Sequence, residues 1–269
     1  MYRMKASCLN KQLQRLTLLI LICVLSLLLH AWSLKIKPEQ ALNAKEIIKK
    51  SEDRLRGQTS IAELSIDIIR PTWSRTMKVK GWTKGETFSM IFITAPVKDK
   101  GTVFLKRHKE VWNWLPSIER IIKLPPSMMT QSWMGTDFTN DDLVKESSVV
   151  NDYTQQITGE AIIQGRKCWK IEMIPLPEAA VVWGKVILWI DQQDFLQLRI
   201  EFMDEEYEPV NLMQCSDIRE LGGRMIATRM EMMPVDKPGN KTVLKYQSII
   251  FNQPIADDFF TTQQMKIIK

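Results

Sequence analysis

The sequence predicts a mainly β domain with few helices (α+β), in which a meandering antiparallel sheet curls into a barrel. Apolar and polar side chains alternate over most of the chain, as in residues 62–68. Turn signals such as Gly165, Gly222-Gly223 and Pro238-Gly239 separate about eleven to twelve such runs. The sequence pattern lacks the regular strand–helix alternation of a parallel sheet, so an α/β fold is excluded.

Residues 1–33 have the features of a secretory signal peptide. Basic residues at 3, 5, 11 and 15 precede an unbroken apolar run at 16–29. This run is shorter than the ~20 residues that a membrane-spanning helix needs. Small residues at Ala31 and Ser33 suggest cleavage after Ser33. An uncleaved N-terminal anchor is the alternative, and both place the remaining chain outside the cytoplasm.

Cleavage at this position would change the charge of the protein. The whole chain has 37 basic and 31 acidic residues, and the leader contains four basic and no acidic residues. The mature part therefore carries a net charge of about +2. Such a mixed surface does not predict nucleic-acid binding, which depends on clustered Lys and Arg.

Residues 34–269 are expected to form a single domain that begins with a helix. Pro38 suits the first turn of this helix, apolar residues from Ala41 to Leu55 recur at helical spacing, and Gly57 is placed to end it. The predicted strands follow, at residues 62–68, 73–83, 88–93, 102–106, 110–115, 157–163, 168–174, 185–190, 196–203, 210–216, 225–233 and 243–251.

One segment, residues 117–150, interrupts the succession of strands. Pro126 can occupy the first turn of a short helix, on which Met129 and Trp133 share one face. Thr139 and Asp142 have the spacing of a capping box, with Asp in place of the usual Glu or Gln. These short helices could form a lid, or an ordinary connection that plugs one end of the barrel.

Residues for enzymatic chemistry or for a cofactor are scarce. His108 is the single histidine after the leader, and it lies in a basic turn. A catalytic triad would need that histidine, and a zinc site would need several His or Cys residues. The carboxylate pairs Asp141-Asp142, Glu205-Glu206 and Asp257-Asp258 lie at turns or helix starts, where they serve as caps. We therefore expect no enzyme, no metal and no cofactor.

Tryptophan and methionine are abundant instead. The chain has nine Trp and fifteen Met, and both residue types form walls that suit apolar ligands. For any one of these residues, core packing is the better explanation. Together they predict an apolar ligand cavity formed by Trp73, Met77, Met90, Phe92, Trp112, Trp114, Met129, Trp133, Trp169, Met173 and Trp189.

Two cysteines, Cys168 and Cys215, remain after the leader. In an oxidising compartment they could form a disulfide. Two buried free thiols are the equal alternative, because the sequence does not give the distance between their Cα atoms.

Several runs of the sequence resemble the LolA-like outer-membrane lipoprotein-sorting proteins. Residues 133–143 and 183–191 carry the most specific similarity, which extends to 111–116, 196–202 and 255–261. The resemblance as a whole covers nearly all of the mature chain, from about residue 41 to residue 266. The resemblance implies an incomplete β-barrel whose helical lid covers an apolar cavity.

The resemblance also implies a function. It suggests a monomeric periplasmic carrier of lipoprotein acyl chains or phospholipid, with an inner-membrane RND-type transporter as a possible partner. An accessory domain that only docks such a transporter is the alternative. In the better-known carriers an arginine on an early strand holds the lid; here Arg75 and Lys84 are the nearest basic residues, and neither is a confident match.

Overall fold

The computed structural model describes residues 42–144 and 148–268. The expected signal peptide, residues 1–33, and Pro38 lie outside them. Within the described residues, thirteen strands form one antiparallel sheet, which confirms the mainly β class. The expected number of about eleven strands was too low. None of the helices in these residues has the length and apolar composition needed to cross a membrane.

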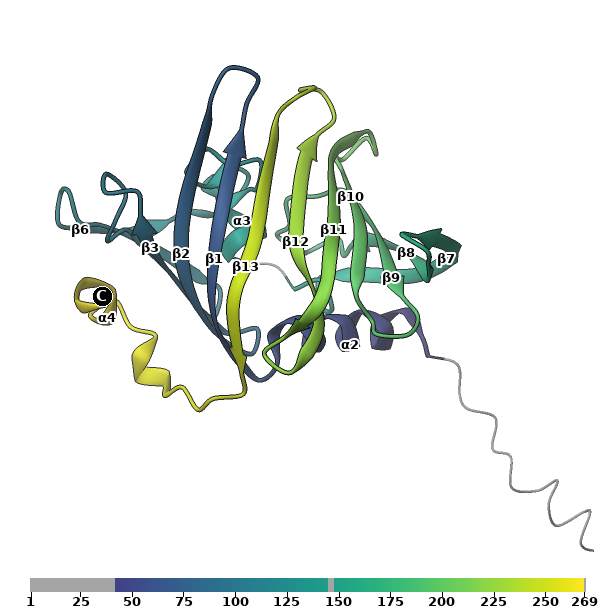
Figure 1. Ribbon diagram of the computed structural model, residues 1–269, viewed down its shortest axis with the longest axis horizontal. Coiled ribbons are helices and arrows are strands. Elements are labelled where there is room, and N and C mark those ends of the chain that lie inside the picture. The colour runs from purple at the N-terminus through teal and green to yellow at the C-terminus, as the bar shows by residue number, and fades with distance from the viewer. Residues whose placement is uncertain (1–41, 145–147, 269) are drawn as a thin grey trace, which may run out of the picture. The chain divides into compact units, whose positions relative to one another are not determined.

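The first six strands follow one another both along the chain and in the sheet (Figure 1). Their bounds are β1 Thr59–Ile69, β2 Ser74–Lys84, β3 Phe88–Ala95, β4 Val103–Arg107, β5 Glu110–Leu115 and β6 Arg120–Leu124. The sequence analysis missed β6, because this short, charged run lies between proline-containing turns and reads as a connection. It pairs with β5 from Val111↔Leu124 to Leu115↔Arg120.

The remaining strands form the second half of the sheet. Their bounds are β7 Tyr153–Ile163, β8 Arg166–Pro175, β9 Lys185–Asp191, β10 Gln197–Met203, β11 Pro209–Leu221, β12 Arg224–Pro234 and β13 Lys241–Phe251. The sheet order is β6-β5-β4-β3-β2-β1-β13-β12-β11-β10-β9-β8-β7. The two halves therefore join through the pairing of β1 with β13, and β6 and β7 are the edges of an open sheet.

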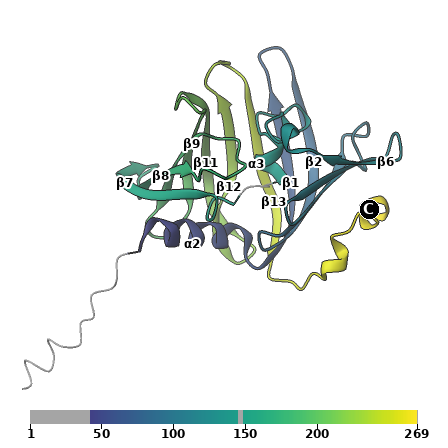
Figure 2. The same ribbon diagram turned by 180° about the vertical axis from the view of Figure 1, so that it is seen from behind.

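Helix α2, Ala44–Arg56, begins at a capping box that the sequence analysis did not identify. The Asn43 side chain accepts a hydrogen bond from the Glu46 amide at 2.9 Å, and Glu46 accepts one from the Asn43 amide at 3.0 Å. Gly57 ends the helix with φ 62°, as expected. The helix buries Ile47 and Ile48 and contacts β7, β9 and β12 (Figure 2).

The segment between β6 and β7 contains short helical turns, which are η1 Pro126–Met128, η2 Trp133–Gly135 and α3 Asn140–Val144. We call residues 125–144 the lid. The expected Thr139–Asp142 capping box is confirmed, with hydrogen bonds of 2.8 and 3.1 Å. The expected short helix that carries Met129 and Trp133 on one face is instead two separate turns, since Ser132 between them has a non-helical ψ of 124°.

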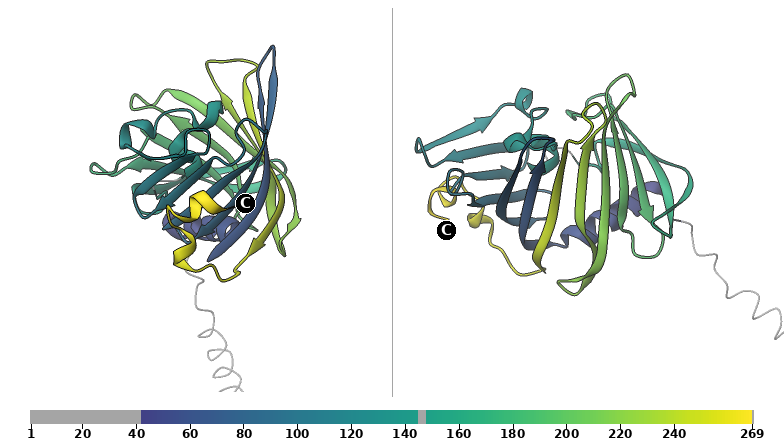
Figure 3. Two further views of the ribbon diagram at one scale, coloured as in Figure 1. Left: turned by 90° about the vertical axis from the view of Figure 1, so that its left-hand side faces the viewer. Right: turned by 45° about the horizontal axis from the view of Figure 1, so that its top comes forward.

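The sheet has an inner face, toward α2 and the lid, and an outer face. The C-terminal segment covers part of the outer face after leaving β13 (Figure 3). It contains η3 Asp257–Phe259 and α4 Gln264–Ile267. Phe260 is fully buried, and its ring stacks on Phe88 with centroids 5.1 Å apart. The Lys84 ammonium holds the segment through Asp257 at 2.5 Å.

We predict that Phe260→Ala lowers the free energy of unfolding by about 3–5 kcal/mol, because it removes a buried aromatic ring and leaves a cavity. Urea unfolding followed by circular dichroism measures this change. Ile267→Ala, whose side chain is 66% exposed in the same segment, is the control and should change stability by less than about 0.5 kcal/mol. Equal effects would contradict the anchoring role of Phe260.

Candidate functional site: an apolar cavity under a lid

A cavity of about 290 Å³ lies between the inner face of the sheet, α2 and the lid. This volume is near the lower limit of ligand pockets, which range over about 300–1,000 Å³. Its walls are mostly apolar, with aliphatic, Met and aromatic side chains, and those of the sheet come from both of its halves. They include Ala62, Leu64, Ile66, Val79, Ile91, Met173, Val186, Leu188, Ile200, Met213, Met230, Met232 and Leu244.

Strand register explains why these side chains share a face. Paired residues of neighbouring antiparallel strands point to the same side of the sheet. In the first half, Ala62 pairs with Gly81, which pairs with Ile91. In the second half, a continuous row crosses the sheet from β9 to β12 and consists of Leu188, Ile200, Met213 and Met232. The cavity wall is therefore set by pairing across strands.

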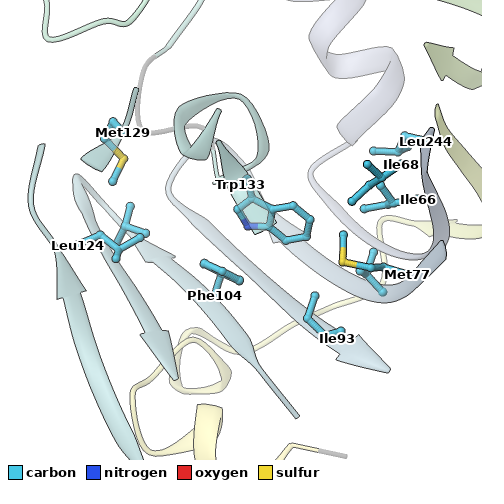
Figure 4. Packing of buried hydrophobic residues seen from close by; sticks show 11 residues of the cluster. Ile66, Ile68, Met77, Ile93, Phe104, Leu124, Met129, Trp133 and Leu244 are labelled. Atoms are coloured by element: carbon cyan, nitrogen blue, oxygen red, sulfur yellow. The ribbon is translucent and has the colours of Figure 1, made fainter. Parts of the chain in front are cut away.

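Trp133 of the lid closes one end of the cavity. Its side chain is fully buried, and its ring lies 5.3 Å from that of Phe104. Figure 4 shows the Trp133 ring with Ile93 below it and with Met77 and Ile66 to one side. Among the described residues, the Trp133 indole N–H has no hydrogen-bond partner. An unpaired buried donor costs about 1–3 kcal/mol, so this lid end contains a polar group that a ligand oxygen can pair with.

Two arginines hold the lid to the sheet at the same end. Arg70, directly after β1, donates to Asp137 at 3.0 Å and to the Gly135 carbonyl at 3.1 Å. Arg75 of β2 donates to the Met134 carbonyl at 2.5 Å. Thr242 of β13 adds a 2.6 Å hydrogen bond to the Asp137 carboxylate. Polar contacts thus fix the lid around the buried Trp133 side chain.

These contacts show which basic residues reach the lid. Arg75 contacts it, whereas Lys84 binds the C-terminal segment through Asp257 and the Ile255 carbonyl. The sequence analysis missed Arg70, which makes more lid contacts than Arg75. No sequence signal identifies it, because a basic residue before Pro71 reads as an ordinary turn.

The far part of the lid is fixed by Asp142. This carboxylate accepts a hydrogen bond from the Trp183 indole at 3.0 Å, and Trp183 packs on Phe202 with centroids 5.1 Å apart. Burial raises the pKa of Asp142 above its ordinary 3.8, and hydrogen bonds from Trp183 and Thr139 only partly oppose this. Burial, with the nearby Asp141 and Asp142 charges, also raises the pKa of Tyr153.

Five of the predicted cavity residues lie on the inner side. Trp133 and Met173 line the cavity itself. Met77 and Met129 belong to the buried cluster around Trp133. Trp169 packs its ring 5.7 Å from Phe195, whose side chain lines the cavity.

Four others, Met90, Phe92, Trp112 and Trp114, lie on the outer face and pack with Phe260 and Met265 of the C-terminal segment. Register connects them: Met90 pairs with Leu105, which pairs with Trp112. The structure thus corrects their assignment to the cavity wall. Strands β3 and β4 are apolar on both faces, and alternation separates two faces without saying which one points inward.

The two remaining tryptophans also lie away from the cavity. Trp189 is on the outer face of β9, between the Lys170 and Arg199 side chains at 5.6 and 5.1 Å. Trp73 precedes β2 in a hairpin turn and is 51% exposed, with Arg70 over its ring at 5.8 Å. A two-residue alternation does not reveal that Trp73 lies beyond the end of the strand.

Cys168 and Cys215 are free thiols, so the possible disulfide is not formed. Cys215 lines the cavity on the inner face of β11, whereas Cys168 packs with Trp189 on the outer face of β8. Side chains on opposite faces cannot meet the short Cβ–Cβ distance of a disulfide. Burial raises the pKa of Cys168 to about 11 and that of Cys215 to about 12, so both are protonated near neutral pH.

Comparisons with known proteins agree with this architecture. A family model described as an uncharacterized protein matches residues 85–267. No curated protein matches the sequence. Solved structures that share the fold include the following three.

An outer-membrane lipoprotein-sorting protein domain from Vibrio parahaemolyticus is 19% identical, with a TM-score of 0.74 over 83% of this chain and 98% of that one. A DUF1329 family protein from Desulfovibrio piger is 20% identical, with a TM-score of 0.75 over 82% and 97%. A LolA superfamily protein from Nitrosomonas europaea is 22% identical, with a TM-score of 0.72 over 83% and 100%. The expected LolA-like fold is confirmed.

We predict that Arg70→Gln loosens the lid, because it removes the cation that compensates the buried Asp137 carboxylate. Losing a charge-assisted hydrogen bond of this kind costs on the order of 2 kcal/mol, so amide hydrogen exchange in residues 133–138 should accelerate at least about tenfold. Arg120→Gln, at the exposed edge strand β6, is the control and should leave lid exchange unchanged. Equal lid protection in the two variants would refute the clamp.

The buried carboxyl group of Asp142 should make the stability of the protein depend on pH. A raised pKa means that the folded protein binds a proton on Asp142 more tightly than the unfolded chain does. This contribution to stability is complete below the unfolded value of 3.8 and is lost as pH rises through the folded pKa. The stability of the wild type minus that of Asp142→Asn should therefore decrease from pH 4 to pH 7 in urea titrations. A difference that grows with pH would contradict it.

Proposed function

Because this chain belongs to the uncharacterized-protein family that matches residues 85–267, and has the LolA-like fold, we propose that it is a carrier of acyl chains. Its cargo would be a lipid or a lipoprotein, taken up in the cavity and moved between the inner and outer membranes. The single observation that carries this proposal is an apolar cavity covered by a lid with polar clamps.

The lining of the cavity suits acyl chains. Aliphatic and Met side chains offer dispersion contacts without directional demands, so chains of different length and shape can bind. Each CH₂ group removed from water contributes about 0.8 kcal/mol. A polar cargo would gain little from the apolar part of the wall around Leu64 of β1 and Leu244 of β13.

Lid movement would control access. Trp133 fills the lid end of the cavity, and the nearby clamps at Arg70 and Arg75 are hydrogen bonds and ion pairs at the rim. When the rim opens, water can hydrogen-bond to the freed guanidinium and carboxylate groups, whereas exposing an apolar seal would gain no such compensation. Opening at this rim would withdraw the Trp133 ring, and cargo would then pass to an acceptor that holds it more tightly, with no chemical step.

The proposed location is the periplasm. The expected leader at residues 1–33 and the sorting function in the description of the Vibrio parahaemolyticus structure support it. The carrier needs no catalytic group, and His108 lies in the exposed turn between β4 and β5 rather than in the apolar cavity.

We predict that Ile91→Asp reduces bound lipid by at least about tenfold, because it places a charge in the apolar wall. The full chain is purified from a bacterial periplasm, and co-purifying lipid is quantified by mass spectrometry. Ile250→Asp makes the same change on β13 at a side chain that is 47% exposed, and it should retain wild-type lipid content.

Lipid-free wild-type protein that stays lipid-free when offered vesicles would reject the carrier function and favour a domain that docks a membrane transporter. Equal lipid content in the Ile91 and Ile250 variants would reject this cavity as the binding site. Circular dichroism and thermal unfolding establish that both variants are folded.

A further inference from the structure

A row of polar side chains crosses the inner face of the sheet at the end away from the clamps. Ser60 of β1 pairs with Thr83 of β2, Thr83 pairs with Ser89 of β3, and Ser89 pairs with Lys106 of β4. All four line the cavity. The Ser60 and Thr83 hydroxyls lie 2.7 Å apart and share a hydrogen bond. The row therefore forms a continuous polar band across the first four strands of the cavity wall.

Polarity changes in the same direction along each of these strands. Two residues further on, the next row is Ala62, Gly81, Ile91 and Phe104, and β1 continues inward with Leu64 and Ile66. The clamps at Arg70 and Arg75 lie at the far end of the same strands. Along these four strands the cavity wall thus changes from apolar near Trp133 to polar at the row, which matches a molecule with a tail and a head; the lid also contributes the carboxyl groups of Asp141 and Asp142.

A second pocket, of about 470 Å³, continues from the polar end. It shares Glu52, Arg56, Glu86, Lys106 and Val149 with the main cavity, so the two spaces adjoin. The remaining walls of this vestibule are polar or charged, and they are Thr87, His108, Lys109, Ser148, Asn151 and Asp152.

Charges of both signs face the vestibule. Arg56, Lys106 and Lys109 are cationic, and Glu52, Glu86 and Asp152 are anionic. Some of these charged side chains pair with one another, as in the 3.0 Å ion pair between Arg56 and Glu52. Glu86 accepts a hydrogen bond from the Ser148 hydroxyl at 3.0 Å, which keeps its carboxylate at the wall. Lys109 and His108 are exposed in the β4–β5 turn, where the His108 amide donates to the Thr87 carbonyl at 2.8 Å. The balanced charges disfavour a purely anionic or purely cationic head.

We propose that the cargo is a phospholipid with a zwitterionic head of phosphate and ammonium. This proposal rests on the proposed carrier function. Its tail occupies the apolar cavity, and its glycerol ester region lies along the polar row. The phosphate lies toward His108 and Lys109, and the ammonium lies toward Glu86. The wall chemistry of the two pockets thus selects both parts of one amphiphile.

The test measures selectivity. The purified full chain is incubated with vesicles that contain phosphatidylethanolamine, phosphatidylglycerol and diacylglycerol with the same acyl chains, and the lipids taken up are quantified by mass spectrometry. The wild type should favour phosphatidylethanolamine. Glu86→Gln removes the proposed ammonium partner and should lower the ratio of phosphatidylethanolamine to phosphatidylglycerol at least about threefold. Glu63→Gln, an exposed position on the outer face of β1, should leave the ratio unchanged.

Lys109→Gln supplies a second measurement. It should lower uptake of both phospholipids relative to diacylglycerol at least about threefold, because only the phospholipids carry phosphate. Lys78→Gln, on the exposed outer face of β2, is its control. Free glycerophosphoethanolamine, which lacks acyl chains, should compete poorly; strong competition would show a soluble phosphate ligand and overturn the proposal.

The two hypotheses fail in different ways. Lipid uptake without head selectivity, and with no change in either ratio for the Glu86 and Lys109 variants, would overturn the zwitterionic head and leave the carrier function standing. Preference for phosphatidylglycerol would do the same. Absence of any lipid uptake by the wild type would reject the carrier function itself.

Discussion

The structure depends on one constraint: strands β3 and β4 are apolar on both faces, and both faces must be covered. On the outer face, the C-terminal segment supplies Phe260 and Met265, and the contact is tight. On the inner face, the lid supplies Trp133 and Met129, while α2 approaches from the second half of the sheet. These elements leave a cavity, because a curved sheet of thirteen strands encloses more volume than its side chains fill.

The two coverings differ in how they are held. The C-terminal segment is fixed mainly by buried aromatic rings, and uncovering them would expose much apolar area to water. The lid also buries an aromatic ring, but its backbone is tied to the strands through the guanidinium groups of Arg70 and Arg75. Water can replace these hydrogen bonds when the lid moves. The same sheet therefore has a cover held mainly by aromatic packing on one face and a cover with polar contacts to the strands on the other.

The curvature of the sheet and the register of its strands together place polar and apolar side chains at different parts of the cavity wall. A strand that passes from Ser60 to Ile66 moves from hydroxyl to aliphatic side chains on one face, and its neighbours do the same in step. Because pairing aligns the rows, four modest changes in four strands become one polar band rather than scattered hydroxyls. The charged vestibule lies beyond this band, and the lid clamps lie at the other end, so head and tail of a cargo would meet different parts of the protein.

The sequence by itself determined the class of the fold and most of its elements, because two-residue alternation and turn signals are local properties. It also identified the capping box at Thr139 and the buried face of residues 62–68. It missed β6, whose charged residues and flanking prolines resemble a loop. Only the tertiary structure decided that Met90 faces the C-terminal segment, that Arg70 reaches the lid and that Cys168 and Cys215 are separated. Alternation assigns residues to two faces, but which face becomes the inside depends on pairings and curvature between segments distant in the chain.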